Sequence, residues 1–419
     1  MSTRKIRVYP VDEVSSRSPA EAEARAGGLS REAVDRMWRA AGALYRTGAY
    51  PAVALCVRRH GHVIVDGAIG HVRGNAPGTT EPPVRATPAT LFNLFSASKA
   101  VTAMVLHLLD DRGLVHLDDA VCEYIPEFAR HGKEWITLRH VLTHRAGIPR
   151  VTGQRTDVAL LTDWDRIIAL LCDTKPTWAP GRRLAYHALT GGFVIGEVIR
   201  RVTGRDIRRF LRDEILDPLG FDALDYGVPP ARIAEVAENA ATGLPPPPPF
   251  SWLIDRALGV GHDEAVRLSN DPRFLTGIVP AGNVIGTAEE ACRFYQLLLD
   301  EGRLGGTRIV EPRTVRRAVA ETSYWELDLT LFMPLRYGMG FMLGADSVSI
   351  YGRHTGRAFG HLGFTNIVTY ADPERDIAVA LMTSGKPFVH VGLWRWLNVM
   401  RTIADVCPRG DFRSRRLRA

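Results

Sequence analysis

Leu94-Phe95-Ser96-Ala97-Ser98-Lys99 leads into a predicted helix whose hydrophobic residues follow the 3.6-residue period, with Gly113 just past its end. The period predicts a buried helix that begins at Ser96. Lys99 then lies one turn along the same face, within reach of the serine hydroxyl. The hydrophobic positions that define this helix are Val101, Met104, Val105, Leu108 and Leu109.

Ser96 and Lys99 are the residue types that an activated serine nucleophile requires. The helix dipole and burial both disfavour a charged amine at Lys99. A neutral amine beside a hydroxyl can take up the hydroxyl proton as the oxygen attacks a carbonyl carbon. The spacing alone is a weak signal, because Ser2-Thr3-Arg4-Lys5 matches it as well. The alternative is that Ser96 caps the helix and that Lys99 is an exposed residue of its first turn.

Two later segments carry groups suited to the same chemistry. Tyr186 lies in a loop before an apolar helix expected at 193–199, where a phenol can pass a proton between nucleophile and leaving group. Phe359-Gly360-His361-Leu362-Gly363-Phe364 begins an expected strand, and the backbone N–H after its last glycine can point at a developing oxyanion. Taken alone, Tyr186 also fits a core aromatic residue, and the glycine-containing segment also fits a turn.

Strand-like runs lie near both ends of the chain, and helical patterns lie between them. A helix is expected at 30–45 with Ser30 as its cap, and another at 391–404. Residues 58–61 are expected to form a hairpin turn. Strands near both ends predict one sheet assembled from both termini. The expected strands are 52–57, 62–69, 338–343, 364–370 and 377–383.

The predicted organisation is a polar N-terminal extension over residues 1–29, a single unit over 30–405 and a basic C-terminal tail over 406–419. Within the unit, an α/β part is expected at about 30–95 and 335–405, with a mainly helical part at about 96–334.

The helical part is interrupted by five prolines at 245–249, which favour a stiff extended connector. The apolar cluster that follows, from Phe250 to Leu258, suggests a lid or pocket wall that sets acyl length. A helix packed on the core is the alternative.

The composition is that of an ordinary globular protein, with 46% hydrophobic and 24% charged residues. The net charge of +7 is spread along the chain, which argues against a nucleic-acid partner. No stretch has the length and apolar character of a signal peptide or an integral membrane segment, so a cytoplasmic location is expected, with peripheral membrane association left open. The one concentrated basic run is Arg409, Arg413, Arg415, Arg416 and Arg418.

No cofactor or metal is expected. His140 and His144 have the spacing of a zinc pair on a helix, but the glutamate after the first histidine is missing and no third ligand is evident. A Gly-x-Ser-x-Gly nucleophile turn and glycine-rich phosphate loops are also missing, which disfavours an α/β-hydrolase and a nucleotide enzyme. The five widely spaced cysteines favour reduced thiols.

Taken in order, the motifs resemble the signature of the penicillin-binding protein and serine β-lactamase superfamily, which reads Ser-x-x-Lys, Tyr-x-Asn, then Lys-Thr-Gly or His-x-Gly. Residues 142–149 and 280–283 are similar to segments of its branch of β-lactamase-like carboxylesterases, which are class C-like serine hydrolases. The likeness covers roughly residues 35–400. It implies a β-lactamase-like α/β (α+β) sandwich, in which an antiparallel sheet from both termini is flanked by helices, beside a mainly helical domain.

The resemblance also implies roles for individual residues. Ser96 would be acylated, and Lys99 and Tyr186 would move protons. The oxyanion hole would be the backbone N–H groups of Ser96 and Phe364, the latter just after Gly363. His361 would border the substrate.

Two positions depart from the family pattern. Ala188 replaces an asparagine that helps to bind peptide-like acyl groups, and His361-Leu362-Gly363 replaces Lys-Thr-Gly. Both changes favour an esterase or lipase-type hydrolase of a small neutral ester over a β-lactamase or a D-amino-acid peptidase. Acyl transfer, amide hydrolysis and a non-catalytic penicillin-binding-like protein stay open as alternatives, and so does a homo-oligomer.

Overall fold

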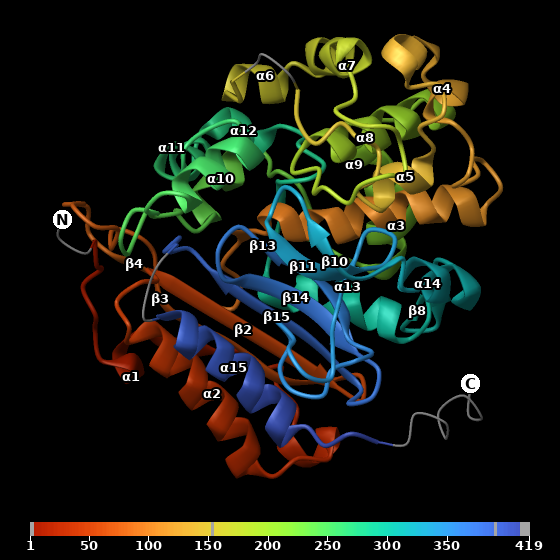
Figure 1. Ribbon diagram of the computed structural model, residues 1–419. Helices are drawn as coiled ribbons and strands as arrows, with labels where there is room; N and C mark the ends of the chain where they lie inside the picture. The colour runs from red at the N-terminus through yellow and green to blue at the C-terminus, as the bar shows by residue number, and fades with distance from the viewer. Residues whose placement is uncertain (1–3, 152–154, 389–391, 411–419) are drawn as a thin grey trace.

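A ten-stranded antiparallel sheet built from both ends of the chain forms one half of the computed structural model, which describes residues 4–151, 155–388 and 392–410 (Figure 1). Along the sheet the strands run β1-β3-β2-β15-β14-β13-β12-β11-β10, and β4 pairs with β3. The strands are β1 (Ser15–Arg17), β2 (Ala52–Arg59), β3 (His62–Arg73), β4 (Val84–Arg85), β10 (Ser323–Asp328), β11 (Met333–Tyr337), β12 (Met342–Leu343), β13 (Phe359–Gly363), β14 (Ile367–Asp372) and β15 (Ile377–Thr383).

The two ends of the chain meet where β15 pairs with β2, for example at Val379 and Val57. The hairpin between β2 and β3 turns at His60 and Gly61, which both have positive φ, of +52° and +79°. Two-residue hairpin turns favour this backbone because its twist matches that of the flanking strands. The expected sheet from both termini is therefore confirmed.

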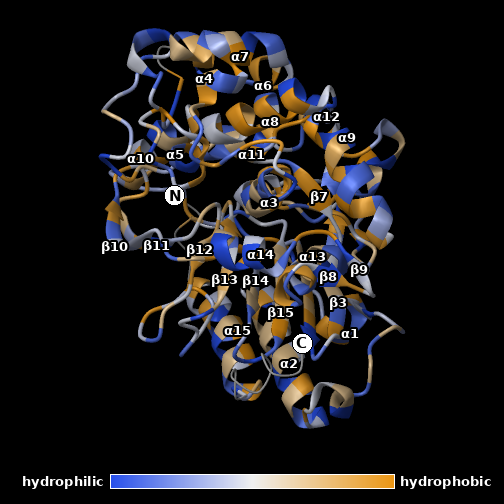
Figure 2. Ribbon diagram, turned by 90° about the vertical axis from the view of Figure 1, so that its right-hand side faces the viewer, coloured by the Kyte–Doolittle hydropathy of each residue, from blue (hydrophilic) through white to orange (hydrophobic). Residues whose placement is uncertain are grey.

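Helices cover both faces of this sheet, so β15 is buried along its whole length. Val379 and Leu381 pack toward α2 (Arg31–Tyr45) and α15 (Gly392–Val406). Alternate residues of β15 such as Ala380 belong to the core on the opposite face, against α13 (Ala288–Leu299). Two covered faces explain why β15 reads as a continuous apolar run, and the view in Figure 2 shows its hydrophobic strand between these helices.

The other half of the molecule is mainly helical, and α3 lies between it and the sheet (Figure 1). Its helices are α3 (Ser98–Asp111), α4 (Val121–Tyr124), α5 (Leu138–Leu142), α6 (Val158–Thr162), α7 (Trp164–Asp173), α8 (Thr190–Thr203), α9 (Ile207–Leu211), α10 (Phe250–Leu258), α11 (His262–Leu268) and α12 (Pro272–Thr276).

The remaining elements are short. They are α1 (Val11–Val14), α14 (Pro312–Ala318), β5 (Phe92–Asn93), β6 (Asp225–Tyr226), β7 (Val284–Gly286), β8 (Arg303–Leu304), β9 (Thr307–Arg308), and the short helical segments η1 (Ala24–Gly27), η2 (Phe95–Ala97), η3 (Pro126–Gly132), η4 (Arg212–Leu216), η5 (Asp217–Leu219) and η6 (Pro230–Glu235).

Two strands differ from the sequence expectation because turns interrupt them. The strand expected at 364–370 begins only at Ile367, since Thr365 and Asn366 have positive φ and form the turn after β13. The segment 338–343 is mostly the turn between β11 and β12, in which Gly340 has a φ of +93°. Strand β10 was also missed, and it lies within the part that was expected to be helical.

The segment before α2 takes part in the sheet. Ser16 of β1 pairs with Ala68 of β3, and Ile6 and Val14 are buried. The sequence predicts a polar extension here because the three-residue strand is too short to produce a periodic pattern. In the basic tail expected at 406–419, residues 411–419 lie outside the described residues.

All five cysteines are free thiols, and four of them are buried. Among the described helices, none combines the length and apolar character that crossing a bilayer requires.

Candidate active site

Ser96 and Lys99 lie at the start of α3, where the helical half meets β13 of the sheet. Ser96 belongs to η2, the turn that leads directly into α3, and its side chain is partly exposed. The Nζ atom of Lys99 lies 3.2 Å from the Oγ atom of Ser96. The pair expected from the sequence therefore forms a hydrogen bond at the edge of a buried helix.

The Lys99 amine is held by two backbone carbonyls as well as by Ser96. It donates to the oxygen of Ala188 at 2.7 Å and to that of Ala281 at 3.1 Å. Burial lowers the pKa of Lys99 well below its usual value. A neutral amine has two N–H groups, and the two carbonyls take both. Its lone pair is then left for the hydroxyl hydrogen of Ser96, which is the geometry of a general base.

The backbone before Ser96 is strained. Phe95 has a φ of +49°, a conformation that costs a side chain larger than glycine about 1–3 kcal/mol. Its N–H donates to Oδ1 of Asn93 at 3.1 Å, which fixes the turn. Two residues after Ser96, Oγ of Ser98 accepts from the N–H of Val284 at 2.9 Å. These two bonds anchor the segment on both sides and aim Ser96 away from the core.

Tyr186 approaches the same pair from the loop before α8. Its hydroxyl forms a hydrogen bond with the side chain of Ser96, and the Lys99 Nζ atom lies 4.7 Å from its ring centre. Burial raises the pKa of Tyr186, the Ser96 hydrogen bond partly offsets this, and the charge of Asp328 adds to it. Asp328 also fixes the loop, because its Oδ1 accepts the Tyr186 backbone N–H at 3.1 Å. The phenol therefore stays protonated next to the serine.

Three buried histidines surround Tyr186 and Lys99. Burial lowers the pKa of His361 to about 3, a charge on Lys99 would lower it further, and the hydrogen bond to the Leu362 carbonyl raises it. Burial likewise lowers the pKa of His187 to about 3 and that of His144 well below its usual value. All three rings are neutral at pH 7. Since Nδ1 of His361 donates to the Leu362 oxygen at 2.7 Å, its Nε2 atom carries the lone pair.

Gly363 allows the end of β13 to approach the segment before Ser96. A Cβ atom at this position would lie 2.5 Å from the carbonyl oxygen of Leu94, a contact that no side chain tolerates. The ring of the next residue, Phe364, lies 5.6 Å from the ring of Phe95. The close approach brings the Phe364 backbone beside the nucleophile segment, as the predicted oxyanion role requires.

A small apolar cavity of about 90 Å³ opens at Ser96. Its walls come from both sides of the site and include Ala188, Leu189, Leu258 and Phe364. Ala188 thus contributes a methyl group to the cavity and a carbonyl to Lys99. The full set of hydrophobic residues is Phe95, Leu161, Ala188, Leu189, Leu258, Val260, Ala265, Leu268, Phe274, Ala281 and Phe364.

The structure brings together all the predicted site residues, but sequence reasoning missed several supports. Asn93 and Asp328 carry no signal of their own in a single sequence, and Ala281 was noted only as part of the 280–283 segment. His144 was noted within the 142–149 segment and as half of a zinc pair with His140, for which structural hydrogen bonding was the preferred explanation, but no role beside Tyr186 was predicted. Helix α5 ends at Leu142, so the two rings do not share a helix face, and His144 instead packs 4.8 Å from Tyr186. No cluster of three or more candidate ligands occurs among the described residues.

The fold and this serine-lysine-tyrosine arrangement are those of a serine hydrolase. The Beta-lactamase family model matches residues 31–398, and the chain belongs to that family. It is 31% identical over 309 residues, 69% of this chain and 68% of the relative, to the esterase/beta-lactamase LipL of Mycobacterium tuberculosis.

Two solved structures share the fold. A penicillin-binding protein homologue from Caulobacter crescentus superposes with a TM-score of 0.77 and 27% identity, covering 90% of this chain and 99% of that one. A family VIII carboxylesterase superposes with a TM-score of 0.74 and 25% identity, covering 89% of this chain and 98% of that one. The predicted β-lactamase-like fold and the assignment to the serine hydrolases of this family are confirmed.

Replacement of Tyr186 by phenylalanine tests whether its hydroxyl moves a proton. We expect Tyr186→Phe to lower kcat for an activated ester by about 10²-fold or more, the usual contribution of a positioned acid or base. The matched control is Tyr295→Phe, which removes another buried phenol, on α13. Equal kcat values for Tyr186→Phe and the unaltered chain would show that the Tyr186 hydroxyl is not needed.

Proposed function

We propose that the protein hydrolyses carboxylic esters through a covalent acyl intermediate on Ser96. The observation that carries the proposal is the Lys99 amine, which lies 3.2 Å from the Ser96 hydroxyl and whose pKa burial lowers well below its usual value. An esterase/beta-lactamase relative and a carboxylesterase neighbour support the same chemistry.

In the first half-reaction, Oγ of Ser96 attacks the ester carbonyl while its proton passes to Lys99. Tyr186, which hydrogen bonds to Ser96, relays a proton to the departing alkoxide, and the C–O bond breaks. In the second half-reaction, a water molecule attacks the acyl carbon and gives up its proton to the Lys99 amine. The Ser96 oxygen then leaves with a proton, and the carboxylic acid is released.

The developing oxyanion needs hydrogen-bond donors that are already in position. We assign this role to the backbone N–H groups of Ser96 and Phe364. The close approach of Gly363 to Leu94 supports the assignment, because it holds the two backbone segments together. Removal of one such donor typically costs about 10²–10³ in kcat.

An ester fits the site better than a β-lactam or a peptide. His361 is neutral, so it offers no cation for a lactam carboxylate next to the serine. Ala188 has no amide side chain with which to bind a peptide-like acyl group. The cavity at Ser96 is lined mainly by hydrocarbon, which favours apolar carbons in the part of the acyl chain next to the carbonyl.

Turnover of an ester and of a β-lactam by the same preparation tests this preference. We expect kcat/KM for p-nitrophenyl butyrate to exceed that for a chromogenic cephalosporin by about 100-fold or more, because the site lacks the polar partners that a lactam requires. Spectrophotometric rates at pH 7.5 measure both. A higher value for the cephalosporin would overturn the proposal in favour of amide-type hydrolysis.

A further inference from the structure

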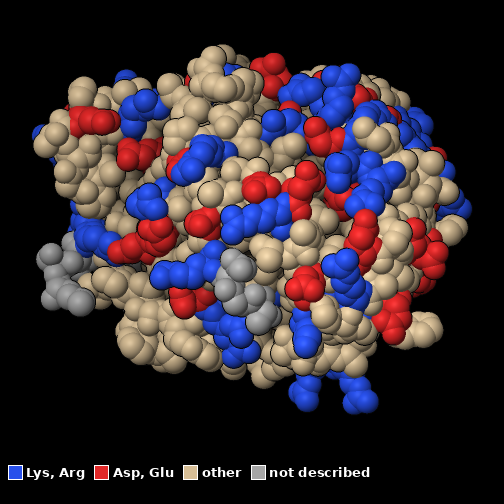
Figure 3. Space-filling model, turned by 90° about the horizontal axis from the view of Figure 1, so that it is seen from above, with Lys and Arg blue, Asp and Glu red and all other residues tan. Residues whose placement is uncertain are grey.

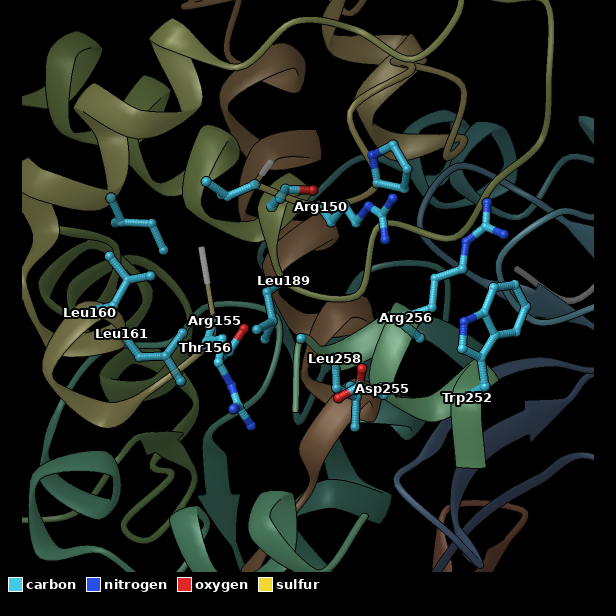
Figure 4. A pocket seen from close by; sticks show the side chains of 16 residues that line it. Arg150, Arg155, Thr156, Leu160, Leu161, Leu189, Trp252, Asp255, Arg256 and Leu258 are labelled. Atoms are coloured by element: carbon cyan, nitrogen blue, oxygen red, sulfur yellow. The ribbon is translucent and has the colours of Figure 1, made fainter. Parts of the chain in front are cut away.

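A second and larger cavity, of about 840 Å³, lies next to the cavity that opens at Ser96. The described residues that form its walls are Arg150, Val151 and Arg155, together with helix α6, the start of α8 and the end of α10. We call it the arginine groove, after the three arginines that line it, Arg150, Arg155 and Arg256 (Figure 4). Neither the serine nor the lysine of the site lines this groove.

The two cavities share walls. Leu189 and Leu258 line both of them, and so do Thr156 and Leu161. Figure 4 shows Leu189 and Leu258 between the two walls of the groove. The arginine groove therefore lies directly beside the cavity that opens at Ser96.

The charge of the groove is mainly positive. Among the described residues that line it, Asp255 is the single carboxylate, against three guanidinium groups. Within the described residues, Arg150 and Arg155 form no hydrogen bond or ion pair, and Arg256 packs over the ring of Trp252 at 5.3 Å. Figure 4 shows Arg150 and Arg256 extended toward the same end of the groove.

Several other surface arginines have carboxylate partners. Arg200 and Arg201, for example, both bind the carboxylate of Glu197. On the face seen in Figure 3, basic and acidic side chains are interspersed. A guanidinium group that has no carboxylate partner can bind a carboxylate or phosphoryl group of a ligand, often through two parallel hydrogen bonds.

We infer that the substrate is an ester whose acyl chain ends in an anionic oxo group, a carboxylate or a phosphoryl group, bound by Arg150 and Arg256. The inference rests on the proposed function, since it places the ester carbonyl at Ser96. The apolar cavity of about 90 Å³ accepts roughly three groups the size of a water molecule. A spacer of about three to four methylene groups therefore separates the carbonyl from the anionic end.

The experiment compares esters that differ only at the far end of the acyl chain. The p-nitrophenyl monoester of glutaric acid and the p-nitrophenyl ester of 4-phosphonobutyric acid carry the anion, and p-nitrophenyl hexanoate is the neutral reference. We expect kcat/KM for at least one anionic ester to exceed that for hexanoate by about tenfold, the effect of one charge-assisted hydrogen bond. The better of the two anions identifies the terminal group.

The double variant Arg150→Gln/Arg256→Gln should reduce this ratio to about one. Arg166→Gln is the matched control, since Arg166 is an exposed arginine of α7 that does not line the groove, and it should keep the ratio. The preference of the unaltered chain should also fall as NaCl is raised, because salt screens exposed charges. A ratio near one in the unaltered chain, or an equal loss in Arg166→Gln, would overturn the inference.

Calorimetric titration of the Ser96→Ala variant with the same esters separates this inference from the proposed function. We expect the favoured anionic ester to bind about tenfold more tightly than hexanoate. If the unaltered chain hydrolyses no ester, the proposed function fails, while the calorimetry still decides whether the groove binds the anion. Equal Kd values for the charged and neutral esters would show that the arginine groove does not bind the anionic group.

Discussion

Replacement of Ser96 by alanine is expected to lower kcat for p-nitrophenyl butyrate by about 10⁴–10⁶-fold without unfolding the protein. Loss of a serine nucleophile removes the covalent route, and the remaining rate comes from binding and from the oxyanion donors alone. The Ser96 side chain is partly exposed and contributes no packing to the core, so the thermal midpoint should change little. Steady-state rates and circular dichroism on one preparation measure both effects.

The neighbouring serine supplies the control. Ser98 is fully buried, and its Oγ atom accepts a backbone hydrogen bond from Val284. Ser98→Ala should therefore lower the free energy of unfolding by about 1–3 kcal/mol, the cost of an unpaired buried N–H, and retain most of the turnover. If Ser98→Ala lost turnover and Ser96→Ala kept it, the nucleophile would be misassigned.

Replacement of Lys99 by methionine is the second large effect, with an expected fall in kcat/KM of about 10³-fold or more. Methionine keeps the length and apolar stem of the side chain but removes the amine that accepts the serine proton. Lys133 offers a matched control, because it too is buried and donates to two backbone carbonyls, those of Cys172 at 2.8 Å and Thr174 at 2.6 Å. Lys133→Met should lower stability and keep the ester turnover.

The pH dependence of the same rate identifies the base. The neutral amine is the active form, so kcat/KM rises with pH through the pKa of Lys99 and is level above it. Burial lowers that pKa well below its usual value, so the rise in rate should lie at lower pH than the titration of an exposed lysine. His361 and His187, with pKa values of about 3, are neutral throughout and add no step near pH 6.5. If kcat/KM became level only above pH 10, the result would contradict a buried neutral lysine as the base.

The sequence predicts the central fold because its decisive strands are long and buried on both faces. Strand β15 has the bounds expected for it, and α2 begins after the Ser30 cap as expected. The failures are short elements that no periodicity can reveal. The three residues of β1 are an example, and so are the positive φ angles at Thr365 and Asn366, which divide one expected strand into two.

The core of the site was predictable for a different reason. Ser96 and Lys99 are close in sequence, so the geometry of one helix turn determines their contact. The supports for Lys99 come from far along the chain, since Ala281 is 182 positions away, and Asp328 acts on Tyr186 from 142 positions away. A single sequence holds no record of such contacts. The arginine groove depends on the same kind of long-range packing, between α10 and the segment around Arg150.

Mass spectrometry of the intact chain after treatment with an alkyl fluorophosphonate tests the central claim most directly. An activated serine displaces fluoride and retains the phosphonyl group as a stable adduct. We predict one adduct per chain, mapped to the peptide that contains Ser96, and no adduct in Ser96→Ala or Lys99→Met under the same conditions. An adduct on another residue, or equal labelling of Lys99→Met, would contradict activation of Ser96 by the neutral amine of Lys99.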